Sequence, residues 1–160
     1  MEDKLLSLFE THTQVIRKGK AHKPNEFGSL VRIDEVENGI VCGYQVLAGN
    51  PPDTAGWMPA LKQHQACFGR APEMATGDRG FFSAQNEREA QALGVQKVAL
   101  PGRRRLSAQR AQQQKQRWFR RALRRRAGCE ATIRTLKNPF SMWRATCKGE
   151  QGFSATWVGV

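Results

Sequence analysis

Two runs rich in β-branched residues dominate the first third of the chain. They are residues 28–36 (GSLVRIDEV) and 40–47 (IVCGYQVL), and Glu37-Asn38-Gly39 separates them. Asn and Gly both tolerate positive φ, so Asn-Gly between two such runs is typical of a tight turn between antiparallel strands. The pattern therefore predicts a β-hairpin over residues 28–47.

A helical period begins after the Pro- and Gly-containing stretch that follows the hairpin. Residues 57–68 (WMPALKQHQACF) place their larger apolar side chains and one histidine, His64, on a single stripe of a helix. We interpret His64 as a partly buried member of this stripe rather than as a catalyst. The pattern predicts a helix over residues 57–68.

Residues 73–100 predict a strand, a helix and a second strand. The strands are expected at 73–77 and 95–100, and the helix from Ala84 to Leu93. Ser83 supplies an N-cap for this helix because its hydroxyl can accept from a backbone N–H of the first turn. A strand–helix–strand unit predicts a parallel pair with a right-handed crossover.

A long basic helix is expected over residues 107–137. Its apolar side is formed by Trp118, Phe119, Ala122, Leu123, Ile133 and Leu136. Arginines cover the rest of the helix, and Asn138-Pro139 ends it because Pro cannot continue a helix. Together these elements indicate the α/β fold class.

The charge is uneven along the chain. Residues 1–100 hold 11 Lys/Arg and 12 Asp/Glu, whereas residues 101–160 hold 15 and 2, so nets of −1 and +13 add to the total of +12. Such asymmetry suggests a polyanionic partner, most simply nucleic acid. The alternative is a solvated or disordered basic tail.

Length and cysteine content set further bounds. A chain of 160 residues suits one domain, and its apolar share of 39% is below the usual value of about 45–50%. The four cysteines form no C-x-x-C pair, so we expect reduced thiols of a cytoplasmic protein rather than a zinc site. No apolar run approaches the roughly 18 residues that a membrane span needs, so we expect none.

Asp78 follows the strand expected at 73–77. In open α/β sheets, ligands bind beyond the carboxyl ends of the parallel strands, so Asp78 is a candidate ligand-binding residue. The alternative is that Asp78 only shapes the turn Asp78-Arg79-Gly80, because Asp is common in such turns.

Glu130 is the one acid among residues 90–149, and it lies on the basic helix. Arg126 and Arg134 are four residues before and after it, so an ordinary surface ion pair of about 0.3–0.5 kcal/mol explains it in one interpretation. In the other interpretation, the apolar Ile133 marks the buried side of the helix, and Glu130 points at the carboxyl ends of the strands, near Asp78. Two acids among arginines suit a divalent metal beside bound phosphates, as in a nuclease or strand-transfer site.

Several segments match one known family in the expected order. They are residues 9–46 (FETHTQVIRKGKAHKPNEFGSLVRIDEVENGIVCGYQV), ATGDRGFFSAQNE (75–87), KQRWFR…RAGCEATIRTLK (115–137) and the closing GEQGF…WVGV (149–160). From about Leu8 to Val160 the chain resembles the C-terminal half of a bacterial insertion-sequence transposase of the DDE type.

The resemblance implies a fold, a chemistry and partners. The fold would be part of a ribonuclease-H-like catalytic domain that occupies residues 1–160 as one domain. Asp78 and Glu130 would be two of three acids that hold Mg²⁺ in a two-metal site for cutting and joining DNA. The partner would be DNA, at the insertion-sequence ends and the target, with a homo-oligomer in the intact family and a bacterial cytoplasmic, nucleoid-associated location. The residues expected to bind nucleic acid are Arg103, Arg104, Arg105, Lys115, Arg117, Arg120, Arg121, Arg124 and Arg125.

The chain departs from the family pattern at one important point. In the family the first catalytic Asp lies on the first, central strand of the sheet, upstream of the segments matched here. We therefore expect a truncated domain that lacks this strand, with an incomplete metal site and no activity of its own. Asp34 precedes Asp78 and Glu130 in the chain, but it lies near a solvated turn on what the resemblance makes the second strand, so it is a weak substitute.

A second hypothesis involves no catalysis. The basic C-terminal part, with Trp118 and Phe119 interleaved among its arginines, would bind the DNA or RNA backbone without chemistry.

Overall fold

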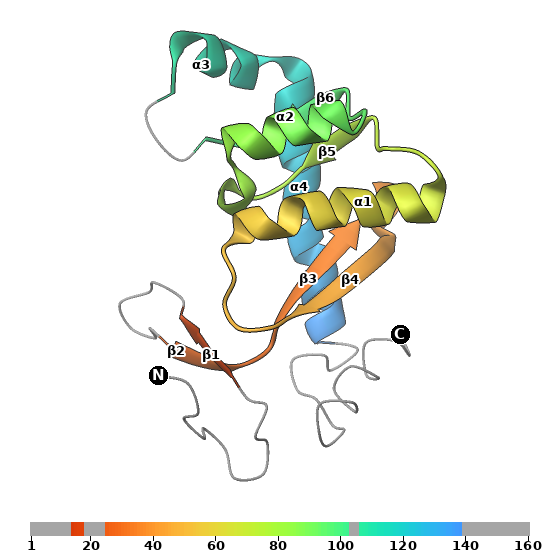
Figure 1. Cartoon of the computed structure of the whole chain (residues 1–160), viewed down its shortest axis with the longest axis vertical. Helices are drawn as coiled ribbons and strands as arrows, with labels where there is room; N and C mark the ends of the chain where they lie inside the picture. The colour runs from red at the N-terminus through yellow and green to blue at the C-terminus, as the bar shows by residue number, and fades with distance from the viewer. Residues whose placement is uncertain (1–13, 18–24, 103–105, 139–160) are drawn as a thin grey trace. The chain divides into compact units, whose positions relative to one another are not determined.

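The computed structural model describes residues 14–17, 25–102 and 106–138 (Figure 1). It confirms the expected α/β class and is compatible with part of a ribonuclease-H-like fold. The strands and helices are β1 (Gln14–Arg17), β2 (Asn25–Gly28), β3 (Leu30–Glu35), β4 (Val41–Leu47), α1 (Trp57–Phe68), β5 (Met74–Thr76), α2 (Ala84–Ala92), β6 (Lys97–Ala99), α3 (Ala108–Lys115) and α4 (Arg117–Lys137). Short 3₁₀ turns are η1 (Glu37–Gly39), η2 (Asp53–Gly56) and η3 (Arg79–Phe81).

The chain divides into two compact units. Unit 1 comprises Met1–Arg32, Gln45–Pro51 and Ile133–Val160, and unit 2 comprises Ile33–Tyr44 and Pro52–Thr132. In the described part of unit 1, β1 and β2 pair as antiparallel strands. The hydrophobic pattern predicted neither of these short strands.

The β3–β4 pair has the turn that its sequence predicts. Asn38 and Gly39 both adopt positive φ, at 65° and 75°, which confirms the basis of the hairpin prediction. The N–H of Val36 donates to the carbonyl of Ile40 at 2.8 Å and closes the turn. The strands occupy 30–35 and 41–47, slightly inside the predicted range.

In unit 2, β5 and β6 form a parallel pair, as the strand–helix–strand pattern predicts. Met74 lies opposite Lys97, and Thr76 opposite Ala99. Each strand has three residues, so both are shorter than expected. The predicted N-cap is also present, because the Ser83 hydroxyl accepts from the N–H of Asn86 at 3.0 Å.

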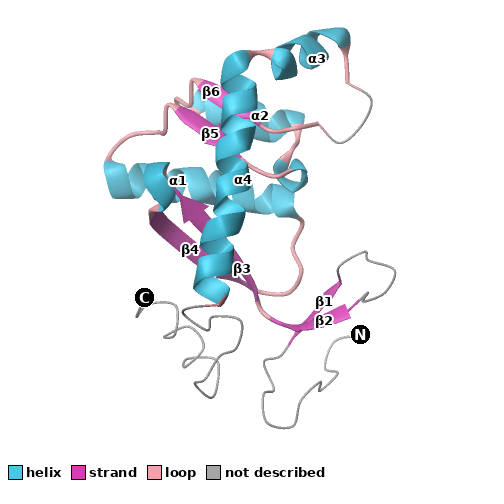
Figure 2. Cartoon of the chain, turned by 180° about the vertical axis from the view of Figure 1, so that it is seen from behind, coloured by secondary structure: helices cyan, strands magenta, loops and turns pink. Residues whose placement is uncertain are grey.

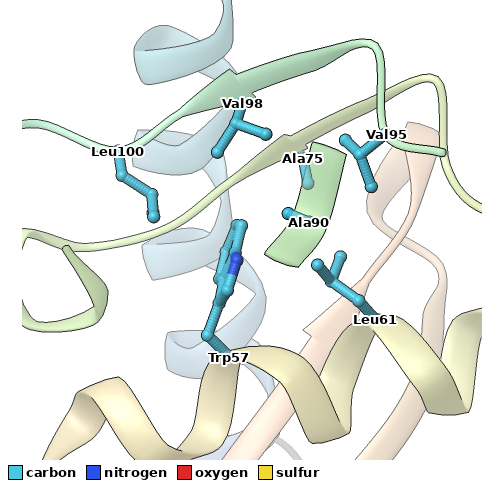
Figure 3. Packing of buried hydrophobic residues seen from close by; sticks show 7 residues of the cluster. All are labelled: Trp57, Leu61, Ala75, Ala90, Val95, Val98 and Leu100. Atoms are coloured by element: carbon cyan, nitrogen blue, oxygen red, sulfur yellow. The ribbon is translucent and has the colours of Figure 1, made fainter. Parts of the chain in front are cut away.

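The β5–β6 pair is covered on both faces. Figure 1 shows α2 in front of the two strands, and Figure 2, from behind, shows α4 in front of them. Successive side chains of a strand point to opposite faces. Ala75, Val98 and Leu100 therefore pack with α1 and α2, as Figure 3 shows. Met74 and Ala99 pack with α4.

Among the residues that the structure describes, the largest fully buried side chain is Phe119, near the start of α4. It packs with Ala99 of β6 and with Ala122 one turn further along α4. A buried aromatic side chain of this kind typically contributes about 3–5 kcal/mol to stability. Phe119 therefore fixes which face of α4 meets the two strands.

The helix expected over 107–137 is two helices in the structure. Gln116 adopts an extended conformation (φ −63°, ψ 146°) between α3 and α4. The two helices are anchored separately, because Arg110 of α3 binds Glu87 of α2 at 2.5 Å and the carbonyl of Leu100 at 2.6 Å, whereas α4 is anchored by Phe119. Tertiary contacts override the continuous helical propensity here.

Within the described part of the chain, none of the helices combines the length and the apolar composition that crossing a lipid bilayer requires. Residues 103–105 and 139–160 lie outside the described residues.

Candidate functional site

Asp78 lies in a turn that two glycines allow to pack closely. A Cβ on Gly77 would lie 3.0 Å from Cζ3 of Trp57 and 3.1 Å from Cδ2 of Leu100. A Cβ on Gly80 would overlap the carboxylate of Asp53. The sequence Gly77-Asp78-Arg79-Gly80 therefore sets Asp78 directly against the core of unit 2, where its backbone has little room to move.

A buried asparagine ties this turn to α2. Asn86 is 8% exposed, and its side-chain amide donates to the carbonyl of Phe81 at 2.8 Å and to that of Thr54 at 2.9 Å. One side chain thus connects η2, η3 and α2. A buried polar group without a hydrogen-bond partner destabilises the fold. The Asn86 amide keeps both of its partners only while η2 and η3 keep their positions.

The Asp78 side chain does not cap the turn in which it lies. The turn closes through the backbone carbonyl of Asp78, which accepts from the N–H of Phe81 at 3.0 Å, and η3 has no side-chain capping bond. The carboxylate instead forms an ion pair with Nη1 of Arg126. The alternative that Asp78 only shapes a turn thus leaves its side chain unexplained.

Arg126 reaches Asp78 because of its position on α4. It follows the buried Phe119 by seven residues and Ala122 by four, and at about 100° per residue these three share one helix face. That face packs on β5 and β6, so Arg126 lies near the residues that follow β5. Its side chain is 28% exposed, whereas that of Asp78 is 60% exposed.

Glu130 joins the same guanidinium from one turn further along the helix. Nη2 of Arg126 donates to Oε1 of Glu130 at 3.0 Å, and the Glu130 side chain is 74% exposed. The ordinary helix-surface ion pair is therefore present. The same arginine also holds Asp78, so the two acids singled out from the sequence meet on one cation.

The β3–β4 hairpin supports this part of α4. Glu37, in the turn, forms an ion pair with Arg125. Glu35, at the end of β3, lies beside Cys129, and burial together with this carboxylate raises the pKa of the Cys129 thiol above 9.0. The hairpin thus meets α4 at the residues that precede Arg126 and Glu130.

Two carboxylates that converge on a positive group have the donor chemistry for a divalent cation, because Mg²⁺ prefers carboxylate oxygens. The Arg126 guanidinium lies where the two carboxylates hold a positive charge. Among the described residues no group of three or more His, Cys, Asp or Glu side chains could hold a metal ion. Asp34 therefore forms no such group with the pair among the described residues. Its Oδ2 lies beside β4, 3.3 Å from the position that a Cβ on Gly43 would occupy.

The basic residues expected to bind phosphate lie mostly on the surface. Four of them share one exposed face of α4, which we call the outer arginine face: Arg117, Arg120, Arg121 and Arg124. At about 100° per residue this face is opposite the one that carries Phe119 and Arg126. Lys115 on α3 is also exposed, Arg125 is paired with Glu37, and residues 103–105 lie outside the described residues.

Phe119 does not lie on the surface with the basic residues that surround it in the sequence. Phe119 is 0% exposed and packs edge-on against Trp118, with ring centroids 5.4 Å apart. A side chain in the core of unit 2 is not available to a base.

Sequence reasoning identified Asp78 and Glu130 but missed the residues that hold them. The sequence pattern offers Arg126 only as a partner of Glu130, and it indicates no role for Asn86 or Asp53. One signal for Arg126 was available, because its spacing of seven from Phe119 places both on one face of α4. No local signal pointed to the contact between Gly80 and Asp53.

Comparison with known protein families assigns most of the chain to a family. A family model described as "Transposase DDE domain" matches residues 11–160. Comparisons with curated proteins and with solved structures found no match.

Proposed function

The chain belongs to the transposase DDE-domain family, and from this membership we propose that Asp78 and Glu130 are two of the acids that hold divalent metal for cutting and joining DNA. DNA transposition is the process that the family carries out. One observation carries the assignment of the two acids: residues far apart in the chain, on a turn and on a helix, bind the same guanidinium.

The chemistry divides between metal and protein. A divalent cation such as Mg²⁺, when bound, polarises the phosphoryl oxygen and lowers the pKa of the attacking hydroxyl. The residues of this chain supply the position: the glycine-bounded turn holds the Asp78 carboxylate, and α4 holds that of Glu130. Because Arg126 engages both carboxylates, we expect the 160-residue chain by itself to cut little or no DNA.

The outer arginine face would hold the DNA backbone. Its four exposed guanidinium groups can each neutralise a phosphate, which is a sequence-independent interaction that weakens as salt rises. Lys115, and Arg103, Arg104 and Arg105 of the adjoining segment, are proposed to add to this contact. The DNA would be an insertion-sequence end or a target, with a homo-oligomer of a bacterial, nucleoid-associated protein as the working form.

Metal binding tests the assignment directly. We expect Mn²⁺ or Mg²⁺ binding, measured by isothermal titration calorimetry, to be lost in Asp78→Ala and in Glu130→Ala. Glu73→Ala is the matched control, because Glu73 is also an exposed acid of unit 2 and its carboxylate pairs with the surface residue Lys97 at 3.5 Å. Metal binding that is equal in Asp78→Ala and Glu73→Ala would contradict the assignment.

Nicking of supercoiled plasmid tests the chemistry. Any cleavage by the chain should require Mg²⁺ and should disappear in Asp78→Ala while persisting in Glu73→Ala. Cleavage that continues in chelator, or that ignores Asp78, would come from another source and would count against the proposal.

A non-catalytic DNA-binding protein is the second candidate. The observation that favours it is the outer arginine face, which is exposed while the two acids are held by Arg126. Replacing its four arginines by Gln should reduce the slope of log K against log salt by about 3–4 for duplex DNA, at about 0.9 per phosphate contact. DNA binding unaffected by Asp78→Ala, together with absence of metal binding, would favour this candidate over the first.

A further inference from the structure

We propose that Arg126 competes with divalent cations for Asp78 and Glu130, so that the arginine-bound arrangement is a resting state which metal entry opens. The inference rests on the proposed function, because it concerns the same two carboxylates. The inference adds that Arg126 controls when these carboxylates become available to metal.

The charges make simultaneous binding unfavourable. Nη1 of Arg126 pairs with Asp78 and Nη2 with Glu130, so one guanidinium uses its forked donors on both acids, a geometry that suits arginine and carboxylates. A divalent cation on the same oxygens would lie within a few ångströms of the guanidinium carbon. Like charges at that separation repel, so the metal and the arginine exclude one another.

The exchange needs only side chains to move. Both carboxylates are largely exposed and the guanidinium is partly so, and ion pairs in such positions are individually weak. The backbone of α4 is fixed by Phe119 and Ala122, which are buried. Arg126 can therefore withdraw by rotating its long side chain while Glu130 and Asp78 keep their places.

The neighbouring arginine provides a matched control. Arg125 lies on the same helix, carries the same charge and also pairs with an exposed acid, but its partner is Glu37. Arg125→Gln and Arg126→Gln thus remove the same charge from nearly the same place, and only the second removes the competitor for Asp78 and Glu130.

The experiment is calorimetric titration of the 160-residue chain with Mn²⁺, using the wild type, Arg126→Gln, Arg125→Gln and Asp78→Asn. We expect Arg126→Gln to lower the Kd for Mn²⁺ by about 2- to 30-fold, which corresponds to the loss of two exposed ion pairs, and Arg125→Gln to change it by less than about twofold. Far-UV circular dichroism checks that each variant keeps its helices. Arg126→Lys keeps the positive charge but not the forked donors, so its Kd for Mn²⁺ should lie between those of the wild type and Arg126→Gln.

The outcomes separate this inference from the proposed function. Equal gains in Arg126→Gln and Arg125→Gln overturn it, because the effect would then be general charge. Weaker binding in both Arg126→Gln and Arg126→Lys overturns it too, because Arg126 would then hold the acids together for the metal. If wild-type binding is abolished by Asp78→Asn yet unaffected by Arg126→Gln, the proposed metal site stands and only the competition fails. If binding ignores Asp78, both fail.

Discussion

Replacing Gly80 by Ala tests how tightly the turn that carries Asp78 is packed. Gly80 is not among the glycines with positive φ, so an alanine there has no backbone penalty. Its Cβ would overlap the Asp53 carboxylate and lie 2.8 Å from Cβ of Asp53. Since that Cβ is attached to the backbone of η2, rotating the carboxylate alone does not relieve the overlap. We expect a loss of about 1–3 kcal/mol, the usual cost of overpacking.

Gly128→Ala is the matched control with the opposite sign. Gly128 lies within α4, and a Cβ there would meet no heavy atom within 4 Å. Glycine inside a helix is about 1 kcal/mol less favourable than alanine, so Gly128→Ala should add up to about 1 kcal/mol. The same chemical change at the two positions should therefore differ in its effect on the free energy of unfolding by about 1–4 kcal/mol.

Urea unfolding, followed by tryptophan fluorescence and by far-UV circular dichroism, measures this difference. Trp57 packs against Phe81 in the same region, with ring centroids 6.0 Å apart, so fluorescence should respond to a shift of the turn. A Gly80→Ala variant as stable as the wild type would refute the steric reasoning. So would a Gly128→Ala variant that loses as much stability as Gly80→Ala.

Two further predictions concern the supports of unit 2. Asn86→Ala removes two buried hydrogen bonds and should lower the free energy of unfolding, measured with urea, by about 1–3 kcal/mol. Gln85→Ala, at the exposed neighbouring residue, should stay within about 0.5 kcal/mol of the wild type. Equal effects of the two substitutions would contradict the role given to Asn86. His64 should titrate below its ordinary pKa of 6.5, because burial first and Arg70 second disfavour the imidazolium. Its contribution to stability is therefore complete above pH 6.5 and is lost as pH falls through the folded-state pKa. NMR titration measures the pKa of His64, and a value at or above 6.5 would contradict this prediction. His64→Gln should flatten the dependence of stability on pH below 6.5.

Local chemistry allowed some elements to be predicted closely. The Asn38-Gly39 turn needs two positive φ values and has them, and α1 begins at Trp57 and ends at Phe68 as its apolar stripe predicts. Both depend on interactions within a few residues. The break at Gln116 could not be found in this way, because it follows from two anchors, Arg110 and Phe119, whose partners are distant in sequence.

The candidate site shows the same division. A carboxylate after a strand and a carboxylate on a basic helix could be singled out from position alone. That Arg126 would hold both depends on how α4 packs against β5 and β6, and this is decided by Phe119. The closeness of Gly80 to Asp53 is likewise a meeting of two turns, which neither turn reveals by its own sequence.

The shared face of Phe119, Arg126 and Glu130 makes the spacing along α4 as important as the residues themselves. One residue inserted between Phe119 and Arg126 would rotate everything after it by about 100°, which would turn the guanidinium away from Asp78 while Phe119 stayed in the core. Seven inserted residues would restore the direction but displace Glu130 by about 10 Å along the axis. Substitutions on the outer arginine face should therefore be tolerated by the fold, whereas this stretch of the helix should not tolerate any change of length.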